Sequence, residues 1–243
     1  MAIHQRVAMT LETIKMLQHQ TYPIEIVLVG DSKIEQNIAK QTGCRYVQHA
    51  NRPLGAKHQA GIDYARLLSP DVLMTTGSDS WVSLDWVERM LPYLSVYDCV
   101  GQNRWYVLNL QEDSMRIVGP GHGLCQYQGK RAGDPLGVGR LITHEGLEMM
   151  NWQVYPVQNN RNLDGNVYRQ MLYAGLSIGV VNEVPVKILG IKGPWEVLSR
   201  WVERQDNHYF PEPEQWLDKY FLGGLEALNR VRAACWADEM GKQ

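Results

Sequence analysis

The sequence predicts an α/β protein with a mostly parallel central sheet flanked by helices. Over roughly the first hundred residues, helix-like and strand-like segments alternate, and polar loops follow the strand-like runs. Residues 10–18 carry apolar side chains at three-residue spacing, which predicts a helix. Residues 24–29 form a short β-branched run, which predicts a buried strand.

The remaining elements are predicted from the same two patterns. A helix marked by Ile34 and Ile38 ends at Gly43, and another helix covers residues 56–68. Ser83 is predicted to cap a helix that includes Leu91. Strands are predicted at residues 45–47, 71–76, 178–181 and 184–188, a hairpin at 105–118, and helices after residue 162 and over about 214–234.

Composition excludes several classes of protein. The 243 residues include 24 basic and 26 acidic side chains, a formal charge of −2, which argues against a protein whose main affinity is for nucleic-acid phosphates. The cysteines form no CxxC pair, so neither a zinc ribbon nor a redox motif is predicted; they are Cys44, Cys99, Cys125 and Cys235. The sequence shows neither a signal-peptide pattern nor a membrane-length apolar run, and we expect a cytoplasmic protein.

Two polar loops, residues 30–32 and 77–80, each place an aspartate directly after a predicted strand. Ligands of open α/β sheets bind at the carboxyl ends of the strands, so Asp31 and Asp79 are candidate binding residues. Asp31 and Ser32 are also good N-cap residues, and capping the next helix would explain this pair without a ligand.

Four segments in order resemble the glycosyltransferases of family 2, which have the GT-A fold. They are residues 18–32, 51–62, 77–87 and 163–175, and the resemblance covers about residues 6 to 190. It implies a GT-A-like nucleotide-diphospho-sugar transferase domain over residues 1–190, with its first strand short or missing. A helical extension over residues 191–243 is expected to pack on that domain.

The resemblance implies an enzyme that moves a sugar from a nucleotide diphosphate donor to an acceptor hydroxyl, with inversion. Asp164 would be the general base that removes the proton of the acceptor. Asp79 would hold Mn or Mg, whose charge stabilises the departing diphosphate. The acceptor stays open among a glycan, a lipid carrier, a protein and a modified nucleobase.

The resemblance also implies two sets of binding residues. The donor nucleotide would meet Asp31, Ser32, Lys57, His58, Ser78 and Asp79. The acceptor side would include His122, Arg131, Arg140 and Trp195. Simpler interpretations remain: Lys57 and His58 as solvated residues, Asp164 as a helix cap, and Trp195 as a packing residue.

Three departures from the family pattern weaken the implied metal site and the start of the fold. Gly77 and Ser80 stand where the family has acidic residues, which leaves Asp79 as the single carboxylate of that loop, and Leu163 replaces an acidic neighbour of Asp164. Only three residues precede His4, which is too few for a full first strand. Two alternative functions therefore stay open. One is a non-catalytic module that binds a nucleotide sugar or a glycan, and the other, which is less favoured, is a nucleotidyltransferase.

Overall fold

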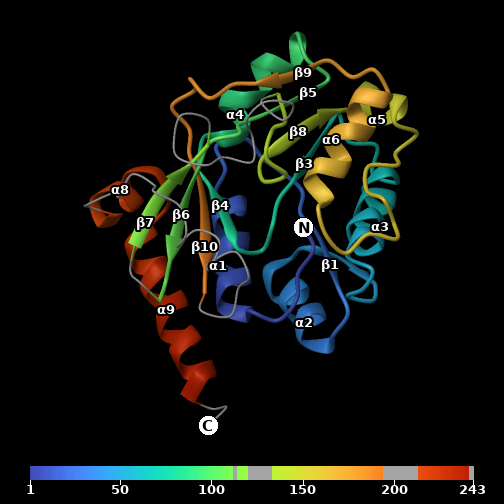
Figure 1. The fold of residues 1–243 in the computed structure, drawn as a ribbon. Helices are drawn as coiled ribbons and strands as arrows, with labels where there is room; N and C mark the ends of the chain where they lie inside the picture. Colours follow the sequence, from blue (N-terminus) through green and yellow to red (C-terminus); the bar gives the residue numbers. More distant parts are fainter. Residues whose placement is uncertain (112–113, 120–132, 194–212, 241–243) are drawn as a thin grey trace.

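The computed structural model describes residues 1–111, 114–119, 133–193 and 213–240 (Figure 1). Its first part alternates helices and strands as predicted. The elements are α1 (Val7–Gln18), β1 (Val27–Gly30), α2 (Lys33–Thr42), β2 (Arg45–Gln48), α3 (Leu54–Arg66) and β3 (Val72–Thr75). Local sequence signals fix the ends of α2: Ser32 and Glu35 form a reciprocal capping box, and Gly43 ends the helix at φ 69°.

The second part contains short strands and helices. The elements are β4 (Ser80–Val82), α4 (Trp86–Met90), the 3₁₀ helix η1 (Leu91–Ser95), β5 (Cys99–Gly101), β6 (Trp105–Asn109), β7 (Ser114–Val118), β8 (Arg140–Thr143), α5 (His144–Met149), α6 (Leu163–Tyr173), β9 (Ile178–Val180), β10 (Ile188–Lys192), α8 (Pro213–Tyr220) and α9 (Gly224–Met240). The predicted hairpin is confirmed as the antiparallel pair β6–β7. No described helix is long and apolar enough to span a bilayer.

The predicted mostly parallel sheet is wrong, because the sheets are mixed. The described strands form the parallel pair β1–β2 and two four-stranded sheets, β3-β8-β5-β9 and β4-β10-β6-β7. In each four-stranded sheet one pair is parallel and two are antiparallel. Of the four antiparallel pairs of described strands, β6–β7 is a hairpin, and the other three join strands distant in the sequence, so the local alternation of helices and strands does not predict them.

Three predicted elements are corrected. Ser83 does not cap α4, because the N-cap of that helix is Asp85. The hydroxyl of Ser83 instead accepts the backbone N–H of Lys187 at 3.0 Å. The strand predicted at 184–188 begins at Ile188, and the single predicted C-terminal helix consists of α8 and α9. In each case a contact distant in sequence, or a local break, determined the boundary.

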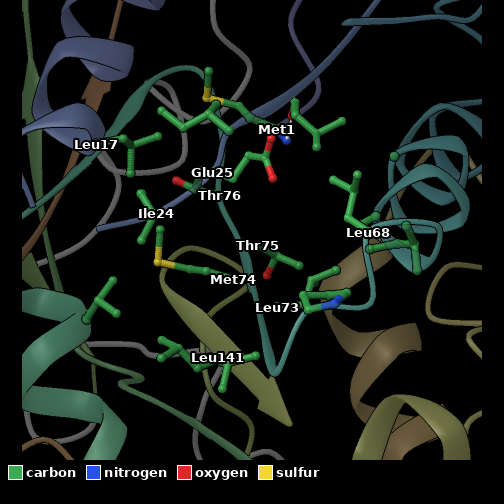
Figure 2. A pocket seen from close by; sticks show the side chains of 18 of the residues that line it. Met1, Leu17, Ile24, Glu25, Leu68, Leu73, Met74, Thr75, Thr76 and Leu141 are labelled. Carbon is green, nitrogen blue, oxygen red and sulfur yellow. Dashed lines mark hydrogen bonds between the residues drawn. The ribbon is translucent and has the colours of Figure 1, made fainter. Parts of the chain in front are cut away.

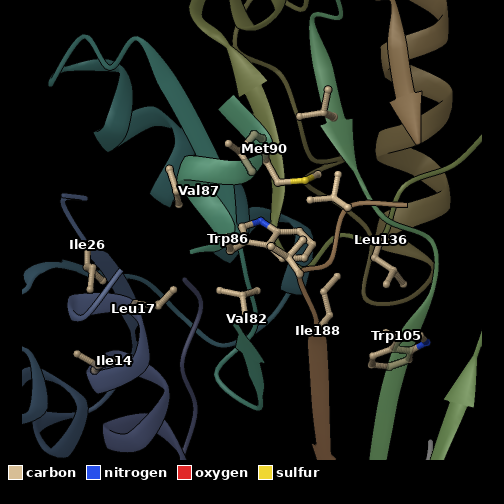
Figure 3. Close-up of a cluster of buried hydrophobic side chains, with 14 of the residues drawn as sticks. Ile14, Leu17, Ile26, Val82, Trp86, Val87, Met90, Trp105, Leu136 and Ile188 are labelled. Carbon is tan, nitrogen blue, oxygen red and sulfur yellow. The ribbon is translucent and has the colours of Figure 1, made fainter. Parts of the chain in front are cut away.

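Three groups of buried apolar side chains form the core. The largest joins α1, α4 and β10 around Trp86, which is fully buried and donates its indole N–H to Gly139 O at 2.9 Å (Figure 3). The second packs α8 and α9 against α1 and the β4-β10-β6-β7 sheet through Trp216 and Phe221. The third lies among α3, α5, α6 and β8. These contacts hold the strand ends, and the loops after them, in fixed positions.

The first strand is reduced to a bridge at Ala2, which pairs in parallel with both Val29 and Gly77. Beside this bridge the edges of β1 and β3 are separated by a largely apolar cavity of about 470 Å³ (Figure 2). Met1, Leu73 and Met74 are among the side chains that line it. The cavity is lined by none of the three candidate aspartates, although one predicted donor residue, His58, is among its lining residues.

Candidate functional site

Asp79 lies between β3 and β4 and is bound by two cationic side chains. Its Oδ2 accepts from Lys192 Nζ at 2.5 Å and from Arg6 Nη1 at 3.3 Å. Its Oδ1 accepts from the hydroxyl of Ser80 at 3.1 Å. Arg6 also donates through Nη2 to the buried hydroxyl of Ser78 at 3.3 Å, so the predicted donor residues Ser78 and Asp79 lie in one cluster.

Sheet pairing brings Lys192 to Asp79 across 113 residues of sequence. Gly190 of β10 pairs with Ser80 of β4, and the backbone N–H of Ile191 donates to Asp79 O at 2.8 Å. Burial by itself would raise the pKa of Asp79. The charges of Lys192 and Arg6 outweigh burial and hold the pKa of Asp79 well below its usual range, so the carboxylate stays ionised.

Asp31 lies at the end of β1 in a second charged group. Its Oδ1 is 3.5 Å from His4 Nδ1, and its backbone N–H donates to Glu35 Oε2 at 2.6 Å. Burial would raise the pKa of Asp31, but the hydrogen bond with Glu35 and the charges of Lys57 and His4 lower it. Ser32 uses its hydroxyl to cap α2, while the Asp31 side chain is 29% exposed, so Asp31 is the member of this pair that can meet a ligand.

Lys57 is fully buried in α3 and holds the N-terminal segment. Its ammonium donates to Ile3 O at 2.5 Å and to Asn51 Oδ1 at 2.9 Å. Burial lowers the pKa of Lys57, and the nearby carboxylates of Glu35 and Asp31 partly restore it. Its role in donor binding stays a prediction, and the hydrogen bonds it makes in the structure are with Ile3 and Asn51.

His58 faces the apolar cavity and stacks on Tyr155, with the ring centroids 4.7 Å apart. Burial, with smaller contributions from the N-terminal ammonium and Lys57, lowers the pKa of His58 to about 3. The ring is therefore neutral at physiological pH and packs as an apolar group. Its predicted contact with the donor also stays a prediction.

We expect His58 to make the free energy of unfolding depend on pH. In the unfolded chain its pKa is about 6.5, so the unfolded state binds the extra proton as the pH falls from 6.5 toward 3. Between pH 6 and 4, the free energy of unfolding of the wild type should fall by about 1 kcal/mol per pH unit more than that of His58→Gln. Urea unfolding of both proteins at pH 7, 6, 5 and 4 measures this difference.

The control is His19→Gln, since His19 is exposed on the surface. That variant should keep the pH dependence of the wild type. Equal pH dependence in wild type and His58→Gln would contradict the neutral, packed state of His58.

Asp164 lies in the first turn of α6 and does not cap it, because the N-cap is Asn162. Its carboxylate lies directly against the backbone of Gly137: a Cβ atom at Gly137 would be 2.1 Å from Asp164 Oδ1. The loop that carries Gly137 is in turn held to β3, because Thr75 Oγ1 donates to Gly137 O at 2.5 Å. Asp164 thus lies near the carboxyl end of β3, the strand that leads to Asp79.

Arg140 lies beneath this region and is completely buried, as is Asp134. Its Nη2 donates to Pro135 O at 2.6 Å and lies 3.6 Å from Asp134 Oδ1. Burial would lower the pKa of Arg140, but the charges of Asp164 and Asp134 contribute to raising it. The guanidinium has no exposed surface, and the place of Arg140 on the acceptor side stays a prediction.

The structure brings the predicted residues together in part. Ser78 and Asp79 belong to one cluster, and Asp31 and Ser32 lie side by side at the start of α2. Asp164 lies near enough to Arg140 for its charge to act on the guanidinium. The predicted acceptor residues His122, Arg131 and Trp195 lie outside the described residues. Sequence reasoning missed Arg6 and Lys192, which carry no local motif and meet Asp79 through tertiary contacts.

The metal that the family resemblance implies does not fit the side chains around Asp79. A divalent cation prefers several oxygen ligands, but both oxygens of this carboxylate already accept from other groups, two of them cations. Within the described ranges one group of carboxylates and histidine could hold a metal, namely His4, Asp31 and Glu35. Both oxygens of Glu35 there accept backbone N–H groups.

Comparison with known proteins agrees with the resemblance. The model of the family "Glycosyl transferase family 2" matches residues 1–118, so the predicted resemblance to this family of nucleotide-sugar dependent enzymes is confirmed over that segment. Enzymes of this fold often use a divalent metal. No curated protein sequence matches the chain.

Among solved structures, the crystal structure of S. aureus TarS 1-349 is similar, with a TM-score of 0.52 and 10% identity. The match covers 79% of this chain and 56% of the TarS chain, so this chain spans little more than half of that structure. A longer S. aureus TarS structure gives a TM-score of 0.49 at 12% identity over 89% of this chain and 37% of that chain. With the family match, the first similarity confirms an α/β GT-A-like fold.

Proposed function

Because residues 1–118 match glycosyl transferase family 2, we propose that this protein is a glycosyltransferase that moves a sugar from a nucleotide diphosphate donor to an acceptor hydroxyl. The observation that carries the proposal is the family match, together with the candidate aspartates near the carboxyl ends of β1 and β3. Asp31 follows β1, Asp79 follows β3, and Asp164 lies against the loop that Thr75 holds to β3. The carboxyl ends of the strands are where an α/β sheet binds its ligands.

In the proposed reaction the acceptor oxygen attacks the anomeric carbon of the donor sugar. The bond from that carbon to the diphosphate oxygen breaks, and the nucleoside diphosphate leaves with the bonding electron pair. Asp164 takes the proton of the acceptor hydroxyl as the new bond forms. Attack from the side opposite the leaving group inverts the anomeric carbon.

The donor would lie between the two charged groups. Asp31, partly exposed and ionised, can accept hydrogen bonds from a ribose or a base. Arg6, 28% exposed beside Asp79, can donate to phosphate oxygens. Arg6 follows the Ala2 bridge and Asp31 follows β1, and Ala2 pairs with Val29 of that strand.

A panel of nucleotide sugars tests the proposal. We expect one of the UDP-, GDP-, ADP- or dTDP-sugars to raise the melting temperature, since a ligand at 100 times its Kd stabilises a protein by about 2.7 kcal/mol. The same donor should yield a nucleoside diphosphate and a glycosylated product when an acceptor is supplied. Absence of any shift across the panel would refute donor binding.

A second candidate is a binding module of the same fold that holds a nucleotide sugar or a glycan without transferring it. The observation that favours it is the single carboxylate in the loop 77–80, already paired with Lys192 and Arg6. A thermal shift with one donor, without donor hydrolysis or transfer by the purified protein, would support this module. Release of inorganic pyrophosphate in place of a nucleoside diphosphate would instead indicate a nucleotidyltransferase.

A further inference from the structure

We propose that Gly137 and Thr75 are positioning residues that fix the place of the Asp164 carboxylate. Their part in catalysis rests on the proposed function, because it depends on Asp164 as the base that removes the proton of the acceptor. The place of the carboxylate itself is independent of that function, because it follows from contacts between the loop 134–139, strand β3 and helix α6.

The loop that carries Gly137 is bound to two neighbouring elements. Thr75, the last residue of β3, donates through Oγ1 to Gly137 O at 2.5 Å and accepts the backbone N–H of Gly139 at 2.8 Å. Trp86, the first residue of α4, donates its indole N–H to Gly139 O at 2.9 Å. Both Thr75 and Trp86 are buried. The backbone against which Asp164 lies is therefore fixed by β3 and α4.

Position 137 needs a glycine for space and not for backbone conformation. The φ of Gly137 is outside the left-handed region, whereas Gly139 of the same loop has a φ of 72°. A Cβ atom at position 137 would lie 2.1 Å from Oδ1 and 2.9 Å from Cγ of Asp164, both shorter than the 3.0 Å below which Cβ contacts essentially do not occur. Any side chain at this position would occupy the place of the carboxylate.

Two constraints then set the place of the Asp164 carboxylate. The charge of the buried Arg140 attracts it, and Arg140 lies against the same loop because its Nη2 donates to Pro135 O at 2.6 Å. The backbone of Gly137 limits how closely the carboxylate can approach. An alanine at position 137 would push the carboxylate outward, since the end of a short side chain changes rotamer more easily than a bound loop shifts.

Gly137→Ala should lower the kcat of sugar transfer about 10²-fold, because a catalytic group displaced by about 1 Å loses about this much rate. The KM for the donor should stay unchanged, since the candidate donor contacts at Asp31 and Arg6 lie in other segments. Initial rates at varied donor concentration measure both quantities. A variant with a raised KM and an unchanged kcat would overturn the inference.

Gly133→Ala is the matched control for this substitution. A Cβ atom at position 133 would lie 3.1 Å from the hydroxyl of Tyr168, which is also in α6. The control therefore adds a methyl group between the start of the same loop and the same helix without meeting Asp164. It should keep the kcat of the wild type.

A double-mutant cycle shows whether Gly137 acts through Asp164. In the Asp164→Asn background the proposed base is already absent, so Gly137→Ala should cause no further loss of kcat. A substitution that merely loosened the fold would lower kcat by the same factor in both backgrounds. That second result would overturn the positioning role.

Thr75 tests the other half of the inference. Thr75→Val removes the hydroxyl that donates to Gly137 O while the side chain keeps nearly the same volume. We expect kcat to fall about tenfold, because the loop beneath the carboxylate loses one hydrogen bond. Thr75→Ser retains the hydroxyl and should restore the rate of the wild type. Equal losses in both variants would overturn the role of the hydroxyl.

Crystal structures of the wild type and of Gly137→Ala separate this inference from the proposed function, because they need no substrate. A carboxylate that lies against Gly137 in the wild type and turns away in the variant supports its fixed place, even if no nucleotide sugar is ever transferred and the proposed function fails. A carboxylate in the same place in both proteins overturns the inference. A displaced carboxylate with undiminished transfer overturns its catalytic part, while sugar transfer stands with another base.

Discussion

Asp164→Asn should lower the rate of sugar transfer by about 10²–10⁴-fold while the affinity for the donor stays unchanged, because the variant lacks the proposed general base. Asparagine has nearly the same shape as aspartate but cannot accept the proton of the acceptor hydroxyl at neutral pH. Loss of the base therefore affects the chemical step and leaves the nucleotide contacts at Asp31 and Arg6 in place.

The surroundings of Asp164 show what else this substitution changes. The side chain is partly buried in the first turn of α6 and does not cap the helix. Its charge is the largest of those that raise the pKa of the buried Arg140, so the variant loses part of the attraction that offsets the burial of this cation. We therefore expect Asp164→Asn to melt below the wild type, and transfer rates and donor affinity should be compared at a temperature at which both proteins are folded.

Initial rates at saturating donor and calorimetric donor affinity should be measured on the same preparations. Asp71→Asn is the control, since Asp71 is exposed on the loop before β3. It should keep both activity and affinity. If Asp164→Asn weakened donor binding as much as transfer, Asp164 would be a donor ligand and another group would have to act as the base.

The sequence predicts the first half of the fold better than the second because the signals there are local. The capping box of Ser32 with Glu35 and the glycine at position 43 set both ends of α2 within the segment itself. Ser83 illustrates the opposite case. The hydroxyl of a serine before an apolar helix can cap that helix or bind a distant group. Here it accepts the backbone N–H of Lys187, 104 residues away in the sequence.

The candidate site follows the same rule. Asp31, Asp79 and Asp164 are detectable because each lies next to or within a recognisable element, the first two after strands and the third in the first turn of a helix. Their partners are not detectable. Arg6 is 73 residues from Asp79 in the sequence and Lys192 is 113, and only the pairing of β10 with β4 brings the lysine there. The family resemblance implies a metal at Asp79, and the sequence around this aspartate carries no sign of the two cations that bind it.

Arg140→Met should destabilise the fold by about 3–5 kcal/mol, because it removes one partner of a buried ion pair. Arg140 and Asp134 are each 0% exposed and lie 3.6 Å apart. Two guanidinium nitrogens, Nε and Nη1, have no hydrogen-bond partner among the described residues, so the attraction of nearby carboxylates offsets much of the cost of burying this cation. Methionine matches the length of the side chain and fills the space with an apolar group.

A double-mutant cycle distinguishes lost charge from lost packing. Asp134→Asn combined with Arg140→Met should be less destabilised than the two single effects summed, because both substitutions remove the same ion pair. Arg89→Ala provides the surface comparison: Arg89 and Asp85 are 58% and 36% exposed, and loss of that ion pair should cost less than about 1 kcal/mol. Urea unfolding measures all four variants. Additive effects at Arg140 and Asp134 would mean that the two side chains are held by packing and not by each other's charge.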